Sequence, residues 1–158
     1  GNVGIFGTPG TVQSRSYDIE ITKLFPDFKV YSQSCPMWVP LVENCEYDKL
    51  GADYFVKQEV DRLFGQEPSI DAVILGCTHY PLLYDKIRQY VPQSARVVTQ
   101  GEIVADSLCD YLRRHPDMDE RCTKGGSCQY LTTENATRFS EMASIFMQEP
   151  ASATRIVL

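Results

Sequence analysis

The sequence predicts an α/β fold with a mainly parallel sheet flanked by helices. Three observations support this prediction. Strand-like and helix-like segments alternate along almost the whole chain of 158 residues. Residues 71–75 form a continuous apolar run, which is typical of a strand buried on both faces of a parallel sheet. Several segments between the strands carry apolar residues at the spacing of a helix.

The elements follow in order from local pattern. Strands are expected at residues 3–6, 28–32, 71–75, 96–99, 129–133 and 154–158. Helices are expected at residues 12–24, 52–64, 81–90, 101–114 and 134–147. Pro81 suits the first turn of its helix, whereas two prolines in residues 35–44 predict a loop with a short turn there. Residues 115–128 are expected to form a long loop.

The helix at residues 101–114 carries five apolar side chains that are expected to face inward. They are Ile103, Val104, Leu108, Tyr111 and Leu112.

Composition excludes several classes of protein. Hydrophobic residues make up 43% and charged residues 23% of the chain, as in ordinary globular domains. The net charge is −6, and the only adjacent basic pair is Arg113-Arg114, so no nucleic-acid partner is expected. No apolar run approaches the roughly 18 residues of a membrane span, and no secretory signal opens the chain. We therefore expect no membrane partner and a cytoplasmic location.

The six cysteines predict reduced thiols rather than a disulfide scaffold or a metal site. They are Cys35, Cys45, Cys77, Cys109, Cys122 and Cys128, and none forms a CxxC pair. Cys122 and Cys128 are unusually spaced for zinc ligands, and the Cys77 segment lies far from them in sequence. No metal is expected, and most of these thiols are expected to be inert packing residues.

Chemistry is expected at the carboxyl ends of the strands, where ligands bind in open α/β sheets. Three loops lie there, at residues 7–11, 35–43 and 76–81. Cys77 leaves a buried strand just before a helix N-terminus, which favours a thiolate. His79 can supply a proton or a positive charge, and Thr78 offers a hydroxyl and an N–H group to an anion. A packed cysteine and a hydrogen-bonded core histidine are the structural alternative.

Three motifs and a closing segment, in order along essentially the whole chain, resemble those of glutamate racemase, in the aspartate/glutamate racemase superfamily. The segment GCTHYPLL at residues 76–83 resembles the second-cysteine motif of that family. The segment GIFGTPGT at residues 4–11 resembles its Gly-Thr loop, and SCPMWVPLVE at residues 34–43 resembles its Cys-Pro segment. The segment YLTTEN at residues 130–135 is similar to its closing strand and helix.

The resemblance implies a cofactor-independent interconversion of L- and D-glutamate by two thiols, which supplies D-glutamate for bacterial peptidoglycan. Cys77 matches one catalytic thiol, and His79 matches the histidine that assists it. Glu43 resembles a carboxylate that orients this histidine or meets the substrate ammonium.

The resemblance also implies substrate-binding residues. Thr78 resembles a residue that binds the substrate carboxylate. Thr8 and Thr11 are weaker candidates for substrate contacts, and ordinary helix capping is their alternative role.

One part of the family pattern is missing. The first catalytic thiol lies in an Asn-Thr-containing motif of the family, and no Cys-Asn-Thr occurs here. Cys35 belongs to the Cys-Pro segment, whose cysteine is not the catalytic partner. The chain therefore resembles the C-terminal part of a racemase: residues 3–99 as the second α/β domain, and residues 100–158 as a segment that packs on the N-terminal half. We expect a folded but inactive chain that has glutamate as its substrate, the missing N-terminal half as a partner and, as is common in the family, a homodimer.

Two other interpretations stay open. The chain could be a relative that racemises aspartate or a hydantoin. It could also be a non-catalytic ligand-binding or interaction domain, which the missing second thiol favours.

Overall fold

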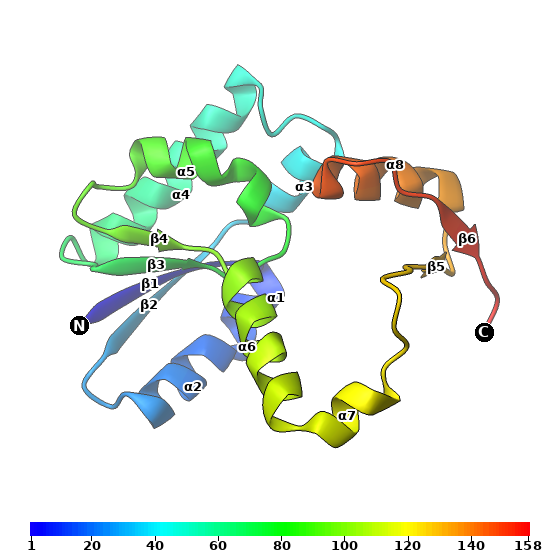
Figure 1. The fold of residues 1–158 in the computed structure, drawn as a ribbon. Coiled ribbons are helices and arrows are strands. Elements are labelled where there is room, and N and C mark those ends of the chain that lie inside the picture. Colours follow the sequence, from blue (N-terminus) through cyan, green and yellow to red (C-terminus); the bar gives the residue numbers. More distant parts are fainter. The chain divides into compact units, whose positions relative to one another are not determined.

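The computed structural model describes all 158 residues and contains a four-stranded parallel sheet (Figure 1). The strands, in the spatial order β2-β1-β3-β4, are β2 (Lys29–Ser34), β1 (Asn2–Gly7), β3 (Ala72–Leu75) and β4 (Arg96–Val98). Val3 pairs with Val30 on one side and with Ala72 on the other, and Ile74 pairs with Val98. The predicted α/β class with a parallel sheet is confirmed.

The helices of this part of the chain connect the four strands, apart from the last helix, which follows β4. They are α1 (Pro9–Ser14), α2 (Ser16–Leu24), α3 (Trp38–Glu43), α4 (Leu50–Gln66), the 3-10 turn η1 (Tyr80–Leu83), α5 (Tyr84–Tyr90) and α6 (Gly101–Arg114). Helices α4 and α5 cover one face of the sheet, and α2 lies on the other (Figure 1). After β2, the chain returns past β1 to form β3. The strand order therefore reverses between β1 and β3, and a ligand crevice is expected beyond their carboxyl ends.

Three buried aromatic rings lie at the centre of the core. The ring of Trp38 packs on Phe6 at a centroid distance of 4.8 Å and on Tyr80 at 4.9 Å. All three side chains are fully buried, and the Trp38 indole N–H donates to the Phe55 carbonyl oxygen at 3.3 Å. The cluster joins β1, α3 and η1 into one packed unit.

Polar contacts fix α4 against its neighbours. Glu59 is the one buried charged residue, and it accepts hydrogen bonds from Gln33 of β2 at 2.7 Å and from Arg62 at 2.9 Å. Asp53 accepts from Lys86 of α5 at 2.7 Å. These bonds tie α4 both to the edge of the sheet and to α5.

The prediction of a loop with a short turn at residues 35–44 is wrong for its second half, which forms α3. Pro40 is the third residue of this helix. At that position a backbone N–H has no intrahelical partner, so a proline removes no hydrogen bond. Pro40 therefore fits the first turn of a helix, whereas Pro36 lies in the turn before it.

The helix expected at residues 12–24 is divided at Arg15, whose φ of 54° is left-handed. Its N–H donates to the Val12 carbonyl oxygen at 3.2 Å and closes α1. The long loop expected at residues 115–128 contains the short helix α7 (Pro116–Arg121), with Pro116 in its first turn.

The expectation that the apolar side chains of α6 face inward is also wrong within this chain. Ile103, Val104, Leu108 and Tyr111 are exposed, Leu112 is half-buried, and α6 has no buried residue. Apolar spacing identifies the face of a helix that is suited to packing, and it does not identify what packs on that face.

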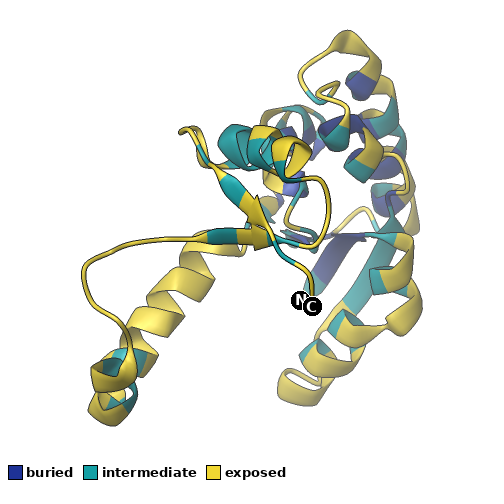
Figure 2. Ribbon diagram, turned by 90° about the vertical axis from the view of Figure 1, so that its right-hand side faces the viewer, coloured by how far each residue is buried: buried dark blue, intermediate teal, exposed yellow.

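The chain divides into two compact units, Gly1–Asp106 and Ser107–Leu158. The second unit contains α7, α8 (Ala136–Met147) and a parallel pair of strands, β5 (Tyr130–Thr132) and β6 (Ala153–Arg155). The Ser140 and Ser144 hydroxyls of α8 accept from the backbone N–H groups of Ala153 and Ala151, each at 2.9 Å. No residue of this unit is buried (Figure 2).

No helix of the structure is both long and apolar enough to span a membrane.

Replacing Trp38 with Ala should lower the free energy of unfolding by about 3–5 kcal/mol, because it leaves a cavity between two aromatic rings. The exposed Tyr54 is the control, since its replacement with Ala should cost less than about 1 kcal/mol. Urea unfolding followed by circular dichroism measures both. Equal losses in the two variants would show that Trp38 is not a core residue.

Candidate functional site

Three side chains form a line of contacts at the carboxyl end of the sheet. Cys77 Sγ lies 3.8 Å from His79 Nδ1, and His79 Nε2 lies 2.6 Å from Glu43 Oε1. The His79 and Glu43 side chains are 23% and 33% exposed, so solvent can reach these contacts, although most of each side chain is covered. An imidazole between a thiol and a carboxylate is suited to moving a proton to or from the sulfur.

The backbone places this line accurately although Glu43 and His79 are far apart in sequence. The Gly76 N–H donates to the Phe6 carbonyl oxygen at 2.8 Å, so the β1–β3 pairing continues up to Cys77. Glu43 ends α3, and His79 immediately precedes η1. The contact between Trp38 and Tyr80 holds α3 against η1 and thereby brings the carboxylate to the imidazole.

Thr8 follows β1, and Thr11 lies in the first turn of α1. Thr8 is the N-cap residue of α1, and its Oγ1 accepts from the Thr11 N–H at 3.2 Å. The two hydroxyl oxygens are 2.9 Å apart. The Thr8 side chain therefore caps α1, and the Thr11 hydroxyl contacts it. The role of both residues as substrate contacts stays a prediction.

A cavity of about 410 Å³ adjoins Cys77. It is lined by Tyr17, Leu75, Gly76, Cys77, Thr78, Pro81, Gln100, Gly101 and Val104. Of the residues singled out from the sequence, it brings together Cys77 and Thr78, whereas Glu43, His79, Thr8 and Thr11 are not in its lining.

Sequence reasoning missed Tyr17 and Gln100. Gln100 follows β4 closely, so the rule that ligands bind beyond strand ends could have found it. Tyr17 lies within a helix, and no local pattern in the sequence distinguishes it from a packing residue.

Cys35 differs from Cys77 in its surroundings. Its side chain is buried, and its Sγ lies 3.5 Å from the Gln33 carbonyl oxygen. Burial, with a smaller contribution from the negative charge of Glu59, raises the pKa of the Cys35 thiol far above its usual range. Burial likewise raises the pKa of the Tyr80 phenol, whose O–H donates to the Cys35 carbonyl oxygen at 3.4 Å. Cys35 is thus held as a neutral thiol.

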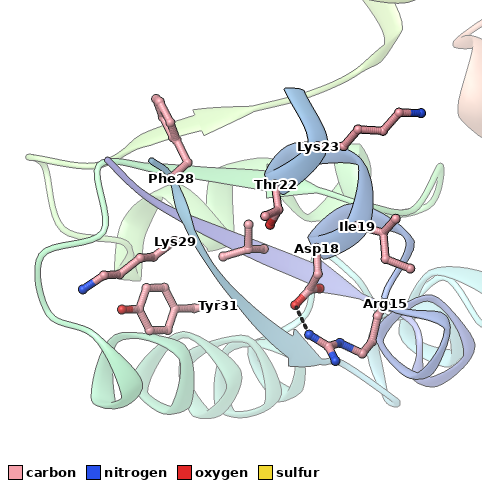
Figure 3. Close-up of a pocket in the computed structure, with 9 residues that line it drawn as sticks. Arg15, Asp18, Ile19, Thr22, Lys23, Phe28, Lys29 and Tyr31 are labelled. Carbon is pink, nitrogen blue, oxygen red and sulfur yellow. Dashed lines mark ion pairs between the residues drawn. The ribbon is translucent and has the colours of Figure 1, made fainter. Parts of the chain in front are cut away.

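A larger cavity, of about 700 Å³, lies between α2 and β2 (Figure 3). Its only ion pair joins Arg15 and Asp18 at 3.8 Å, and it has neither a thiol nor an imidazole in its lining. It therefore lacks both of the side-chain types that meet in the contact between Cys77 and His79. No cluster of three or more His, Cys, Asp or Glu side chains suited to a metal ion occurs in the chain.

Gly76 is a position where a side chain does not fit. A Cβ atom there would lie 2.9 Å from the Phe6 carbonyl oxygen and 3.2 Å from the Tyr17 ring. Replacing Gly76 with Ala should therefore destabilise the fold by about 1–3 kcal/mol. Gly65 in α4 has open space around it, so its replacement with Ala should stabilise the helix by about 0.5–1 kcal/mol. Thermal unfolding of the two variants measures both changes in stability. If the two substitutions change the stability in the same direction, the prediction is contradicted.

Stability should fall in alkaline solution. The folded state keeps the Cys35 and Tyr80 protons to higher pH than the unfolded chain does, because both pKa values are raised. Below about pH 8.5 both states are protonated, and the stabilisation is fully present. Above that pH the free energy of unfolding should drop by up to about 1.4 kcal/mol per pH unit for each group that titrates.

Urea midpoints measured between about pH 8 and about pH 10 test this dependence. Replacing Cys35 with Ala should make the decline shallower, whereas replacing the exposed Cys45 with Ala should leave it unchanged. An equal decline in both variants would exclude Cys35 as a cause.

Known proteins show the same combination of sequence and fold. No protein-family model matches the sequence. A glutamate racemase from Ruegeria sp. (strain TM1040) is 40% identical over 147 residues, which are 93% of this chain and 52% of that protein. The chain thus spans about half the length of the curated relatives it matches.

Two crystal structures extend the comparison. Glutamate racemase isoform RacE1 from Bacillus anthracis has 27% identity and a TM-score of 0.78, over 99% of this chain and 57% of that one. Glutamate racemase from Francisella tularensis in complex with D-glutamate has 24% identity and a TM-score of 0.85, with the same coverage, and shows the same fold. By sequence and fold, this chain is a homologue of the glutamate racemases and corresponds to their C-terminal half.

Proposed function

We propose that this chain supplies one proton-transferring half of a glutamate racemase active site. The observation that carries the proposal is the line of contacts from Cys77 through His79 to Glu43, at the edge of a cavity of about 410 Å³. Its position beyond β1 and β3, where the strand order reverses, supports a ligand site. The similarity to glutamate racemases supports glutamate as the ligand.

In the proposed reaction, Cys77 acts as a thiolate on the α-carbon of one enantiomer. The thiolate takes up the α-proton, and the electron pair of the broken C–H bond stays on the substrate. A second thiol then gives a proton to the opposite face. In the reverse direction, Cys77 is the thiol that gives its proton, and it ends as the thiolate. No cofactor takes part in either direction.

The neighbours of Cys77 have separate roles. His79 exchanges a proton with the sulfur and prepares it for either direction. Glu43, through its 2.6 Å contact, fixes the imidazole so that Nδ1 faces Cys77. The 3.8 Å separation of sulfur and nitrogen is expected to shorten when substrate binds, as is common for catalytic contacts. Thr78 is proposed to bind the substrate carboxylate, with Thr8 and Thr11 as weaker candidates.

The second thiol is proposed to come from a racemase N-terminal half and not from this chain. Cys35 is unsuitable, because it is buried and kept protonated. The exposed apolar side chains of α6 are a candidate contact surface for that half. The assembled enzyme would act in the cytoplasm and supply D-glutamate for peptidoglycan, and a homodimer is the proposed higher assembly.

A non-catalytic ligand-binding domain is the second candidate function. The absence of a Cys-Asn-Thr motif is the observation that favours it. Both candidates bind glutamate, and only the first moves a proton when it is joined to the other half.

Proton exchange distinguishes the candidates. The chain alone, and the chain joined to the N-terminal half of the Ruegeria relative, are incubated with each glutamate enantiomer in deuterated buffer. Deuterium at the α-carbon is followed by NMR and handedness by chiral chromatography. The joined chain should exchange and invert both enantiomers, and the chain alone should invert neither.

In the joined chain, replacing Cys77 with Ser should slow inversion by about a thousandfold or more, since a hydroxyl is a far weaker acid than a thiol. Replacing the exposed Cys45 with Ser is the matched control and should leave the rate unchanged. Inversion that survives in the Cys77 variant contradicts the role of this thiol. Inversion by the chain alone would show that a second proton donor is already present and would contradict the half-site.

A further inference from the structure

We propose that the Tyr17 hydroxyl donates a hydrogen bond to a carboxylate bound in the 410 Å³ cavity, which makes Tyr17 a specificity-determining residue beside Cys77. The identity of that carboxylate, as a carboxylate of glutamate, rests on the proposed function. The hydrogen-bond donor itself is inferred from the structure alone.

The hydrogen bonds of the Gln100 side chain show whether the Tyr17 hydroxyl donates or accepts in this contact. Its amide nitrogen lies 3.0 Å from the Leu75 carbonyl oxygen and 2.6 Å from the Tyr17 hydroxyl oxygen. A carbonyl oxygen can only accept, so the amide must present its nitrogen and not its oxygen. The two N–H hydrogens then serve the two oxygens. Tyr17 is consequently an acceptor in its contact with Gln100.

The hydroxyl hydrogen of Tyr17 is therefore available. The structure shows no other hydrogen bond of this hydroxyl and gives its own hydrogen no acceptor. The side chain is half-buried in the wall of the cavity, so an acceptor would have to come from solvent or from a ligand. Gln100 thus holds the phenol as a donor toward other groups.

The ring position directs this donor to the thiol loop. A Cβ atom on Gly76 would lie 3.2 Å from Tyr17 Cε2 and 3.4 Å from Cζ, the carbon that bears the hydroxyl. The hydroxyl end of the ring therefore rests against the backbone immediately before Cys77. Tyr17, Cys77 and Thr78 line the same cavity.

The side chains of the cavity lining determine how a carboxylate would be held there. Its lining includes no Lys, Arg or His, so an anion must be bound by neutral donors. Tyr17 and Thr78 each provide a hydroxyl for this purpose. A planar carboxylate has two oxygens that can accept from two such donors. Neutral donors also leave the Cys77 sulfur without a competing cationic partner inside the cavity.

Two alkylating reagents test the proposal on the chain as it exists. Iodoacetate carries a carboxylate next to its reactive carbon, whereas iodoacetamide has nearly the same shape and no charge. Rates of Cys77 modification by each reagent are measured by peptide mass spectrometry and normalised to the exposed Cys109 and Cys128 of the same molecules. The iodoacetate-to-iodoacetamide ratio at Cys77 should exceed that of the exposed thiols by about tenfold, as expected for a hydrogen bond to a charged group.

Replacing Tyr17 with Phe keeps the ring and removes the donor, so the ratio at Cys77 should fall to that of the exposed thiols. Replacing Tyr31 with Phe is the control, since Tyr31 bonds Glu67 and lies outside this cavity. Replacing Gln100 with Leu should lower the ratio less, because the hydroxyl remains but is no longer oriented. Circular dichroism verifies that each variant is folded.

Each outcome decides the proposal. The proposal is overturned if the iodoacetate-to-iodoacetamide ratio at Cys77 of the parent chain equals that of the exposed thiols. It is also overturned if Tyr17→Phe leaves the ratio at Cys77 unchanged. Equal slowing by both reagents in Tyr17→Phe also overturns it, because that result assigns Tyr17 to backbone support. The test does not use racemisation, so its failure and the failure of the proposed function are separate results.

Discussion

The contact between the buried rings of Trp38 and Tyr80 is the interaction on which the candidate site depends. Trp38 begins α3, which ends at Glu43, and Tyr80 begins η1, directly after His79. The packed rings therefore fix the two segments that carry the carboxylate and the imidazole. Loosening the cluster would separate the pair without changing either functional side chain, since the interior transmits small displacements through packed contacts.

The sheet provides the second constraint, which places the thiol. The β1–β3 pairing continues to the Gly76 N–H, and the tight fit of Gly76 under the Phe6 carbonyl oxygen holds the chain as it leaves the sheet. Cys77 follows at once, before any flexible segment can intervene. The thiol position is thus set by backbone hydrogen bonds, whereas the position of its imidazole partner is set by aromatic packing. Two different kinds of interaction converge on one site.

Local sequence patterns were sufficient for the sheet and for the thiol loop. The alternation of strands and helices predicted the fold class, and the strand before Gly76 was identified by its apolar run. Local patterns do not predict the role of a residue whose contacts come from segments far away in the sequence. The sequence predicts a loop at Pro40, because the place of this residue in a first helical turn depends on the packing of Trp38. Tyr17 was missed because its contacts with Gly76 and Gln100 join positions far apart in the chain.

The apolar face of α6 also shows that a local sequence pattern does not determine whether a residue is buried. The spacing of Ile103, Val104 and Leu108 is that of a buried helix face, yet all three are exposed. The Ser107–Leu158 unit, in turn, has regular elements and satisfied serine hydrogen bonds but no buried residue. A segment of this size that buries no side chain lacks the core that ordinarily stabilises a domain. A racemase N-terminal half is the partner that we propose for this surface, since the chain matches about half the length of those relatives. Its docking would complete both this core and the proposed active site.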